Sequence, residues 1–225
     1  MRAAMSRDRW TGAFCCLAWT ALASGCFENV AEEFPPGLEP FEEVNEAAPP
    51  MGDDPYPEQL SFEQRRWTRG ALSVHARAYV HADVAETFAA VRNPLAGADR
   101  REAVTFSWDE DVEPEYRWSH RSHLVIPDIV TVEFELTWRS GIVEGTEEAP
   151  EITATRWQKT WGTTAISLLE GSIVCRQVEP GITELEIQYH LDSLAAGYDT
   201  IEGYLQGYLD SILALVRGEP LPIQE

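Results

Sequence analysis

Apolar and polar side chains alternate strictly in the stretch SVHARAYVHA, residues 73–82. A period of two predicts a strand with one buried face. The residues that follow have apolar side chains at helical spacing, and Asp83 and Glu86 have the spacing of a capping box. Because Pro94 disfavours helical backbone at the residue before it, we expect a strand followed at once by a short helix that ends at Asn93.

From residue 104 onward the pattern is almost entirely that of strands. Alternation is clearest at residues 130–138, where Val, Phe, Leu and Trp alternate with Thr and Glu. Pro180 and Gly181 suit the centre of a type II turn between the last two strands. The pattern predicts six successive strands, at residues 104–109, 116–124, 130–138, 152–161, 172–179 and 182–191, although the buried side of the fourth is not defined.

The chain ends in a long amphipathic segment. Apolar side chains recur at spacings of three and four between Ile201 and Val216. Asp199 and Glu202 have capping-box spacing, and Gly218 suits a helix C-terminus. A sheet with one apolar face needs a cover, and this helix has the only apolar stripe wide enough. We therefore expect an α+β fold in which a curved antiparallel sheet wraps around a long C-terminal helix.

This order of elements resembles the SRPBCC superfamily, the helix-grip proteins that include START domains and polyketide cyclases. The resemblance covers residues 71–217 and depends on HADVAETFAAV after the first strand and on EPGITELEIQYHL before the terminal helix. It implies a cavity for a hydrophobic or amphipathic ligand between sheet and helix, and no shared catalytic residues. A lipocalin barrel and the half-barrel of outer-membrane lipoprotein carriers are alternatives, although a helix straight after the first strand does not fit a lipocalin.

The first 26 residues have the pattern of a secretory signal. Three Arg side chains precede a short run of apolar and small residues, which ends in Leu22-Ala23-Ser24-Gly25-Cys26. This ending resembles the bacterial lipobox, in which the cysteine is joined to diacylglycerol and becomes the first residue of the mature chain. The family usually has Leu where Ala23 stands, and ordinary signal-peptidase cleavage, giving a soluble periplasmic protein, is the alternative. The resemblance implies a signal peptide at residues 1–25, lipidation of Cys26 and, because Phe27 rather than Asp follows, location in the outer membrane.

Composition changes abruptly after Cys26. Residues 27–58 contain ten acidic side chains, seven of the 14 prolines and no Lys or Arg. Repelling charges and fixed proline φ angles oppose a packed core and favour an extended, solvated chain. We therefore expect residues 26–58 to be a lipidated cysteine and a disordered acidic tether before a domain at 59–225. Such a tether could span at most about 110 Å, at roughly 3.5 Å per residue.

Several aromatic and polar side chains fall on the apolar sides of the predicted strands and terminal helix. Ligand pockets are mostly apolar and hold few converging polar groups, so these residues are the predicted ligand-binding set. They are Trp118, His120, Phe134, Trp138, Tyr189, Tyr204 and Tyr208. The alternative is that they are ordinary core residues whose polar atoms meet backbone partners.

Charge and motifs exclude several other classes. With 17 basic and 38 acidic residues and a net charge of −21, the chain lacks the clustered cations that nucleic acid or an anionic bilayer surface requires. His120 and His123 point to opposite sides of a strand, and His75 and His81 lie about 20 Å apart, so neither pair predicts a metal site. The sequence has no nucleophile elbow, phosphate loop or Cys-x-x-Cys motif, and no cofactor is predicted.

Together these features predict an envelope lipoprotein whose domain binds a hydrophobic or amphipathic small molecule and whose membrane contact is the lipid on Cys26. Two alternatives stay open. One is an enzyme of the cyclase or hydrolase kind, with His120 as general base beside Tyr204 or Tyr208. The other is a non-catalytic structural or partner-binding lipoprotein, which a large apolar patch on the outer face of the sheet would favour.

Overall fold

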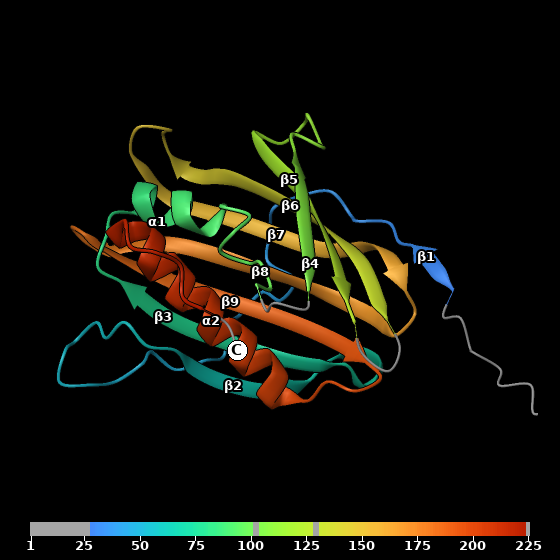
Figure 1. Cartoon of the computed structure of the whole chain (residues 1–225). Coiled ribbons are helices and arrows are strands. Elements are labelled where there is room, and N and C mark those ends of the chain that lie inside the picture. Colours follow the sequence, from blue (N-terminus) through green and yellow to red (C-terminus); the bar gives the residue numbers. More distant parts are fainter. Residues whose placement is uncertain (1–27, 101–103, 128–130, 224–225) are drawn as a thin grey trace, which may run out of the picture.

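A computed structural model describes residues 28–100, 104–127 and 131–223. The predicted signal peptide and Cys26 lie outside the described residues. The described chain forms nine strands, two α-helices and one short 3-10 turn (Figure 1). Neither of these α-helices is long and apolar enough to cross a bilayer.

The strands form one antiparallel sheet, in the order β2-β3-β9-β8-β7-β6-β5-β4, with β1 paired to β7. Their bounds are β1 Asn29–Ala31, β2 Ser61–Arg66, β3 Leu72–Val80, β4 Thr105–Glu110, β5 Trp118–Ile126, β6 Val132–Gly145, β7 Pro150–Thr163, β8 Ile166–Glu179 and β9 Ile182–Ser193. The six strands expected after residue 104 are β4 to β9, and each pairs with the next along the chain. The sequence pattern missed β1 and β2, which are short and mostly exposed.

The helices are α1, Val84–Val91, and α2, Tyr198–Arg217, and the 3-10 turn η1 is Thr68–Gly70. The helix α2 ends where Gly218 takes left-handed backbone with φ of 66°, as its position predicted. The two predicted capping boxes are wrong. The Asp83 carboxylate accepts a hydrogen bond from the Gly181 N–H across the sheet instead, and α2 begins one residue before Asp199.

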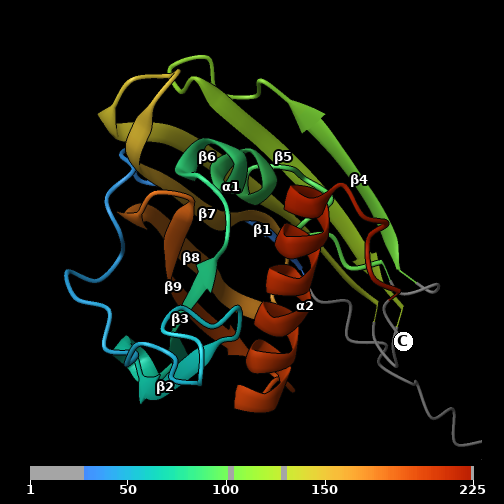
Figure 2. The same cartoon turned by 90° about the vertical axis from the view of Figure 1, so that its left-hand side faces the viewer.

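The concave face of the sheet and the two helices enclose the hydrophobic core (Figures 1 and 2). The buried stripe of α2 consists of Ile201, Leu205, Leu209 and Ile212, each at most 1% exposed. Burial of one such side chain stabilises the fold by about 1.5–3 kcal/mol, so the stripe fixes the helix inside the curve of the sheet. The predicted fold, a curved antiparallel sheet wrapped around a C-terminal helix, is therefore confirmed.

Residues 28–58, which we call the strap, lie on the other side of the sheet. Figure 2 shows most of this segment following the convex face, and its last residue, Glu58, pairs with Arg217 at the end of α2. Its backbone has little regular structure, as the prolines predicted, but Phe34, Ala47 and Pro50 are buried. The expected disordered, solvated tether is therefore wrong for the described part of this segment, because the strap packs against the domain.

The convex face holds the strap because its side chains are polar and often cationic. Lys159 of β7 is 1% exposed and lies 3.1 Å from the Glu32 carboxylate. Arg139 of β6 pairs with Glu113 and donates a hydrogen bond to the Pro35 carbonyl at 2.6 Å. Outward-facing polar residues on a strand predict contact with water, whereas here they satisfy the charges and backbone groups of an extended chain.

Gly171 of β8 allows a close contact that any larger residue would prevent. A Cβ atom there would lie 2.6 Å from the Gln188 carbonyl oxygen and would collide with the Trp157 ring. We expect Gly171→Ala to lower the free energy of unfolding by about 3 kcal/mol, because neither backbone nor ring can move aside cheaply. Equilibrium unfolding in urea, followed by tryptophan fluorescence, measures this loss.

Gly203→Ala is the matched control. A Cβ atom at Gly203, on α2, meets no atom within 4 Å, so this substitution should leave stability unchanged or raise it by up to about 1 kcal/mol. Equal stabilities of the two variants would contradict the close packing of β7 against β8.

Candidate functional site

The seven predicted pocket residues all belong to the inner side of the sheet or to α2. They are Trp118 and His120 on β5, Phe134 and Trp138 on β6, Tyr189 on β9, and Tyr204 and Tyr208 on α2. Trp118 lies at the margin of this set, where its ring packs edge-on against Phe88 of α1 with centroids 5.3 Å apart. The structure therefore brings the set together beneath the helices.

Six aromatic rings form a continuous row across this interior. His120 stacks on Trp138 at 5.4 Å between centroids, and Trp138 stacks on Trp157 at 4.8 Å. The row continues from Trp157 to Tyr189 at 6.0 Å, from Tyr189 to Tyr204 at 5.5 Å and from Tyr204 to Tyr208 at 6.2 Å. Trp157 sits at the centre of the row, and the sequence missed it because the buried side of its strand was not defined.

The row fills the space in which the family resemblance implied a cavity. An interior niche beside the row contains about 150 Å³ of space between atoms and does not admit a water molecule. Its walls are Val91, Asn93, Pro94, Gly97, His120, Trp138 and Tyr208. A ligand could enter only if part of this lining moved.

Two polar groups at this niche have no protein partner. The Trp138 indole N–H is buried without a hydrogen bond, and the His120 ring makes none to the described part of the chain. Burial lowers the pKa of His120 to about 4, so the ring is neutral at physiological pH. An unpaired buried donor costs about 1–3 kcal/mol, so the Trp138 N–H would gain stability from a hydrogen-bond partner in the niche.

Two of the three tyrosine hydroxyls of the row, those of Tyr204 and Tyr208, donate hydrogen bonds to backbone carbonyls. Tyr208 donates to the Val91 carbonyl at 2.7 Å, and Tyr204 donates to the Gly97 carbonyl at 3.4 Å. Burial raises the pKa of both hydroxyls well above the usual tyrosine value. Both remain protonated donors that hold the segment between α1 and β4 over the row.

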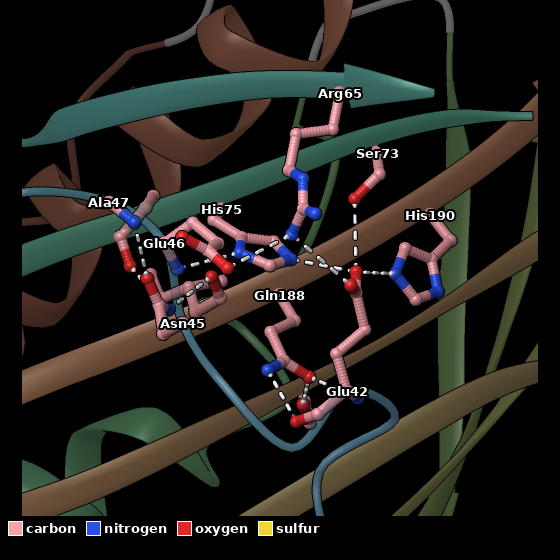
Figure 3. Close-up of polar contacts among 12 residues, drawn as sticks. Glu42, Asn45, Glu46, Ala47, Arg65, Ser73, His75, Gln188 and His190 are labelled. Atoms are coloured by element: carbon pink, nitrogen blue, oxygen red, sulfur yellow. Dashed lines mark hydrogen bonds and ion pairs between the residues drawn. The ribbon is translucent and has the colours of Figure 1, made fainter. Parts of the chain in front are cut away.

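A second cluster lies on the convex face, under the strap (Figure 3). The Glu42 Oε1 atom is 2.7 Å from His75 Nε2 and 2.8 Å from His190 Nε2. Both rings are fully buried. The Gln188 side chain fixes the Glu42 backbone, since its amide accepts from the Glu42 N–H at 2.9 Å and donates to the Glu42 carbonyl at 2.8 Å.

The outer nitrogens of the two histidines also have partners. His75 Nδ1 faces the Glu46 N–H at 2.9 Å, so it accepts there and Nε2 donates to Glu42. His190 Nδ1 lies 3.0 Å from Glu170, so each of its two nitrogens faces a carboxylate. Glu42 and Glu170 thus hold the His190 ring from both sides, and the His75 ring lies alongside.

These atoms also form a candidate metal site, since the ligand atoms of Glu42, His75 and His190 lie within 4.8 Å of one another. A neutral imidazole that binds a metal through Nε2 must carry its proton on Nδ1. At His75 that proton would point at the Glu46 N–H, donor against donor. The arrangement therefore fits a hydrogen-bonded clamp on the strap better than a metal centre.

Sequence reasoning missed this clamp. It compared His75 only with His81 on the same strand, whereas the partner His190 comes from β9. The pairing register sets Ser73 opposite His190 and His75 opposite Gln188, which places the two rings diagonally on one face. The sequence around His75 gives no local sign that His190, which lies on a different strand, will be its neighbour.

Comparison with known proteins gives structural similarity only. No family model matches the sequence, and no curated protein matches it. The chain is similar in structure to human StAR-related lipid transfer protein 5, with 12% identity over 72% of this chain and 84% of that one and a TM-score of 0.49. The human StarD13 lipid transfer and protein localization domain is similar at 11% identity over 73% of this chain and 84% of that one, with a TM-score of 0.48.

The Zhui aromatase/cyclase from Streptomyces sp. R1128 is similar at 14% identity over 65% of this chain and 91% of that one, with a TM-score of 0.41. At such scores the similarity assigns neither a ligand nor a reaction to this chain, and the fold rests on its own strand order and helix.

The Glu42 clamp predicts a pH-dependent contribution to stability. Burial alone would raise the pKa of Glu42, but hydrogen bonds from His75 and His190 outweigh it and hold the pKa below its ordinary value. A depressed carboxylate pKa stabilises the fold above the unfolded-state pKa of about 4.3, and this stabilisation is lost as pH falls through the folded-state value. Glu42→Gln should therefore cost about 2 kcal/mol at pH 7, and this cost should shrink as pH falls below about 4.3 and through the lower folded-state pKa.

Urea unfolding of both proteins at pH 7, 5 and 3.5 measures this difference. Glu43→Gln, at the exposed neighbouring position, is the control and should stay within about 0.5 kcal/mol of the unsubstituted protein throughout. A Glu42→Gln cost that does not change with pH would show that the carboxylate charge is not what holds the strap.

Proposed function

We propose that this protein is an envelope lipoprotein, anchored through Cys26, whose helix-grip domain binds a hydrophobic or amphipathic small molecule at the aromatic row. The lipobox-like sequence supports the anchor, and the confirmed fold and the composition of the inner face support the binding role. The proposal places the polar end of the ligand at His120 and Trp138 and its apolar part against the rings.

The unpaired polar groups at the niche carry this proposal. The Trp138 N–H is a donor, and the neutral His120 ring offers one donor and one acceptor. Around them the interior is apolar, which is the composition of a small-molecule site with few orienting polar groups. A ligand carbonyl or hydroxyl would satisfy both groups at once.

Room for the ligand has to come from the segment between α1 and β4. At Gly97 a Cβ atom would lie 3.3 Å from the Tyr204 hydroxyl and 3.4 Å from the Trp138 ring, so the backbone rests directly on the row. The Tyr204 hydrogen bond to Gly97 is long, at 3.4 Å. Outward movement of this short stretch would open the niche without disturbing the sheet.

Binding is better supported than catalysis. A histidine with a pKa of about 4 is a weak general base at neutral pH, and the raised pKa values of Tyr204 and Tyr208 make them poor proton donors. The partner-binding alternative needed a bare apolar patch on the outer face of the sheet. The strap covers much of that face, and the side chains beneath the strap are polar.

Trp138→Phe tests the binding role, because it removes the N–H donor and keeps an aromatic ring. We expect the affinity for the amphipathic probe 1-anilinonaphthalene-8-sulfonate to fall about 5- to 10-fold, the loss of roughly one hydrogen bond, and co-purifying amphipathic molecules to decrease in extracts analysed by mass spectrometry. Probe fluorescence measures the affinity.

Trp108→Phe is the control, since Trp108 is 40% exposed on the edge strand β4. Its affinity for the probe should match that of the unsubstituted protein. Equal affinities for all three proteins, or no bound molecule in any extract, would contradict a ligand site at the row.

Cys26→Ala tests the anchor separately. The unsubstituted protein should enter the detergent phase of a Triton X-114 separation, and the variant should remain in the aqueous phase because it has no acyl chains. Unchanged partitioning of the variant would refute lipidation at this residue.

A further inference from the structure

We infer that the docked strap holds the domain directly against the bilayer, with the end of the sheet that carries β1 facing the lipid. This inference rests on the proposed lipid attachment at Cys26. The partner is a lipid bilayer, and the surface that contacts it is the end of the sheet that carries β1.

The first observation is how soon after Cys26 the chain joins the sheet. The Thr164 N–H donates to the Glu28 carbonyl at 3.2 Å, and Asn29 of β1 pairs with Thr163 of β7. The Glu32 N–H adds a bond to the Thr160 carbonyl at 2.8 Å. Three residues span at most about 10 Å, so Cys26 cannot be farther than that from Asn29.

The second observation is that the rest of the strap is fixed as well. Lys159 pairs with Glu32, Arg139 binds the Phe34 and Pro35 carbonyls, and Glu42 is clamped by two buried histidines. The Arg139 guanidinium also lies 3.7 Å from the centroid of the Phe34 ring. With these contacts in place the acidic segment gives no long reach, and the domain stays within about 10 Å of its anchor instead of about 110 Å.

The third observation is the chemistry of this end of the domain. Val30 of β1 is 39% exposed, and Leu194, just after β9, is 71% exposed. Both flank the turn between β7 and β8, because Thr164 bonds to Glu28 and the Leu194 N–H donates to the Ala165 carbonyl at 3.1 Å. These apolar side chains would lie beside the acyl anchor, where contact with lipid removes them from water.

A surface groove of about 320 Å³ opens nearby, between the ends of β2, β3 and β9 and the start of α2. Leu72, Leu191 and Tyr198 supply its apolar lining, and Asp192 is its acidic group. The high negative charge of the chain gives no attraction to anionic lipid, so the orientation depends on the short covalent link and suits a zwitterionic surface.

The experiment places the photocrosslinking residue p-benzoylphenylalanine at Leu194 or at Val178 in the full chain, produced in a lipidating bacterial host and reconstituted into phosphatidylcholine vesicles. Val178 is 36% exposed at the opposite end of β8, twelve residues or about 40 Å from Ile166. We expect irradiation to crosslink lipid at residue 194 at least fivefold more than at residue 178, detected as a mass shift. Equal crosslinking at the two positions, or none at either, overturns the inference.

A Gly/Ser insertion of 20 residues between Phe27 and Glu28 supplies the second variant. It adds a flexible spacer of about 25 Å and leaves the described fold unchanged, so crosslinking at residue 194 should fall at least fivefold. If crosslinking at residue 194 does not fall, the length of the link between Cys26 and the domain does not set the orientation.

The acyl mass on Cys26 is measured in the same preparations, which separates the two proposals. If Cys26 carries no lipid, the proposed attachment fails, and the orientation is then tested on residues 26–225, which contain the whole described fold, coupled through Cys26 to a maleimide-bearing phosphatidylethanolamine in the vesicles. If Cys26 is acylated and residue 194 does not crosslink, the inference fails alone.

Discussion

The packing of the α2 stripe against the concave face of the sheet is the contact on which the rest of the structure depends. It removes Ile201, Leu205, Leu209 and Ile212 from water and closes the concave face of the sheet. Once that face is closed, the aromatic row is held in a single arrangement. The convex face carries mostly polar side chains, and the strap covers it with ion pairs, hydrogen bonds and a few apolar side chains such as Phe34.

The strap packs against this polar face. An acidic, proline-rich segment cannot form a core, but it can lie along a polar sheet whose side chains provide opposite charge. Glu42 is the centre of this contact, since one of its carboxylate oxygens contacts two buried histidines, and one of these histidines lies between two glutamates. Removing a carboxylate and two imidazoles from water is costly. The contact of Glu42 with His75 and His190 is favourable only because the Nδ1 atom of each histidine also has a hydrogen-bond partner.

The histidines of the two faces differ in how completely they are hydrogen-bonded. Under the strap the histidines are fully hydrogen-bonded, which makes the cluster a structural device. At the aromatic row His120 and the Trp138 N–H stay unpaired in a space too small for water. The Trp138 N–H would gain a hydrogen bond from a ligand, and this supports the binding role proposed for the concave face.

The sequence by itself determined the elements whose signal is local. Alternation in β3 and β6 and helical spacing in α2 reflect the periodicity of one segment, and they placed the inner-facing residues from Trp118 to Tyr208 correctly. The face of Trp157 was not readable, because bulky side chains occupy both sides of its strand. The polar, outward faces of the strands were expected to contact water. The sequence of one strand cannot distinguish a polar residue that contacts water from one that pairs with a glutamate far away in the chain.

Only the tertiary structure decided what depends on residues far apart in the chain. The contact between Glu42 and His190 joins residues 148 positions apart, and it exists because the β3–β9 register brings His75 and His190 to one face. Whether the rings enclose a cavity or fill it depends on the summed shapes of side chains from four strands and a helix. Periodicity shows which way a side chain points, and packing alone decides what it meets there.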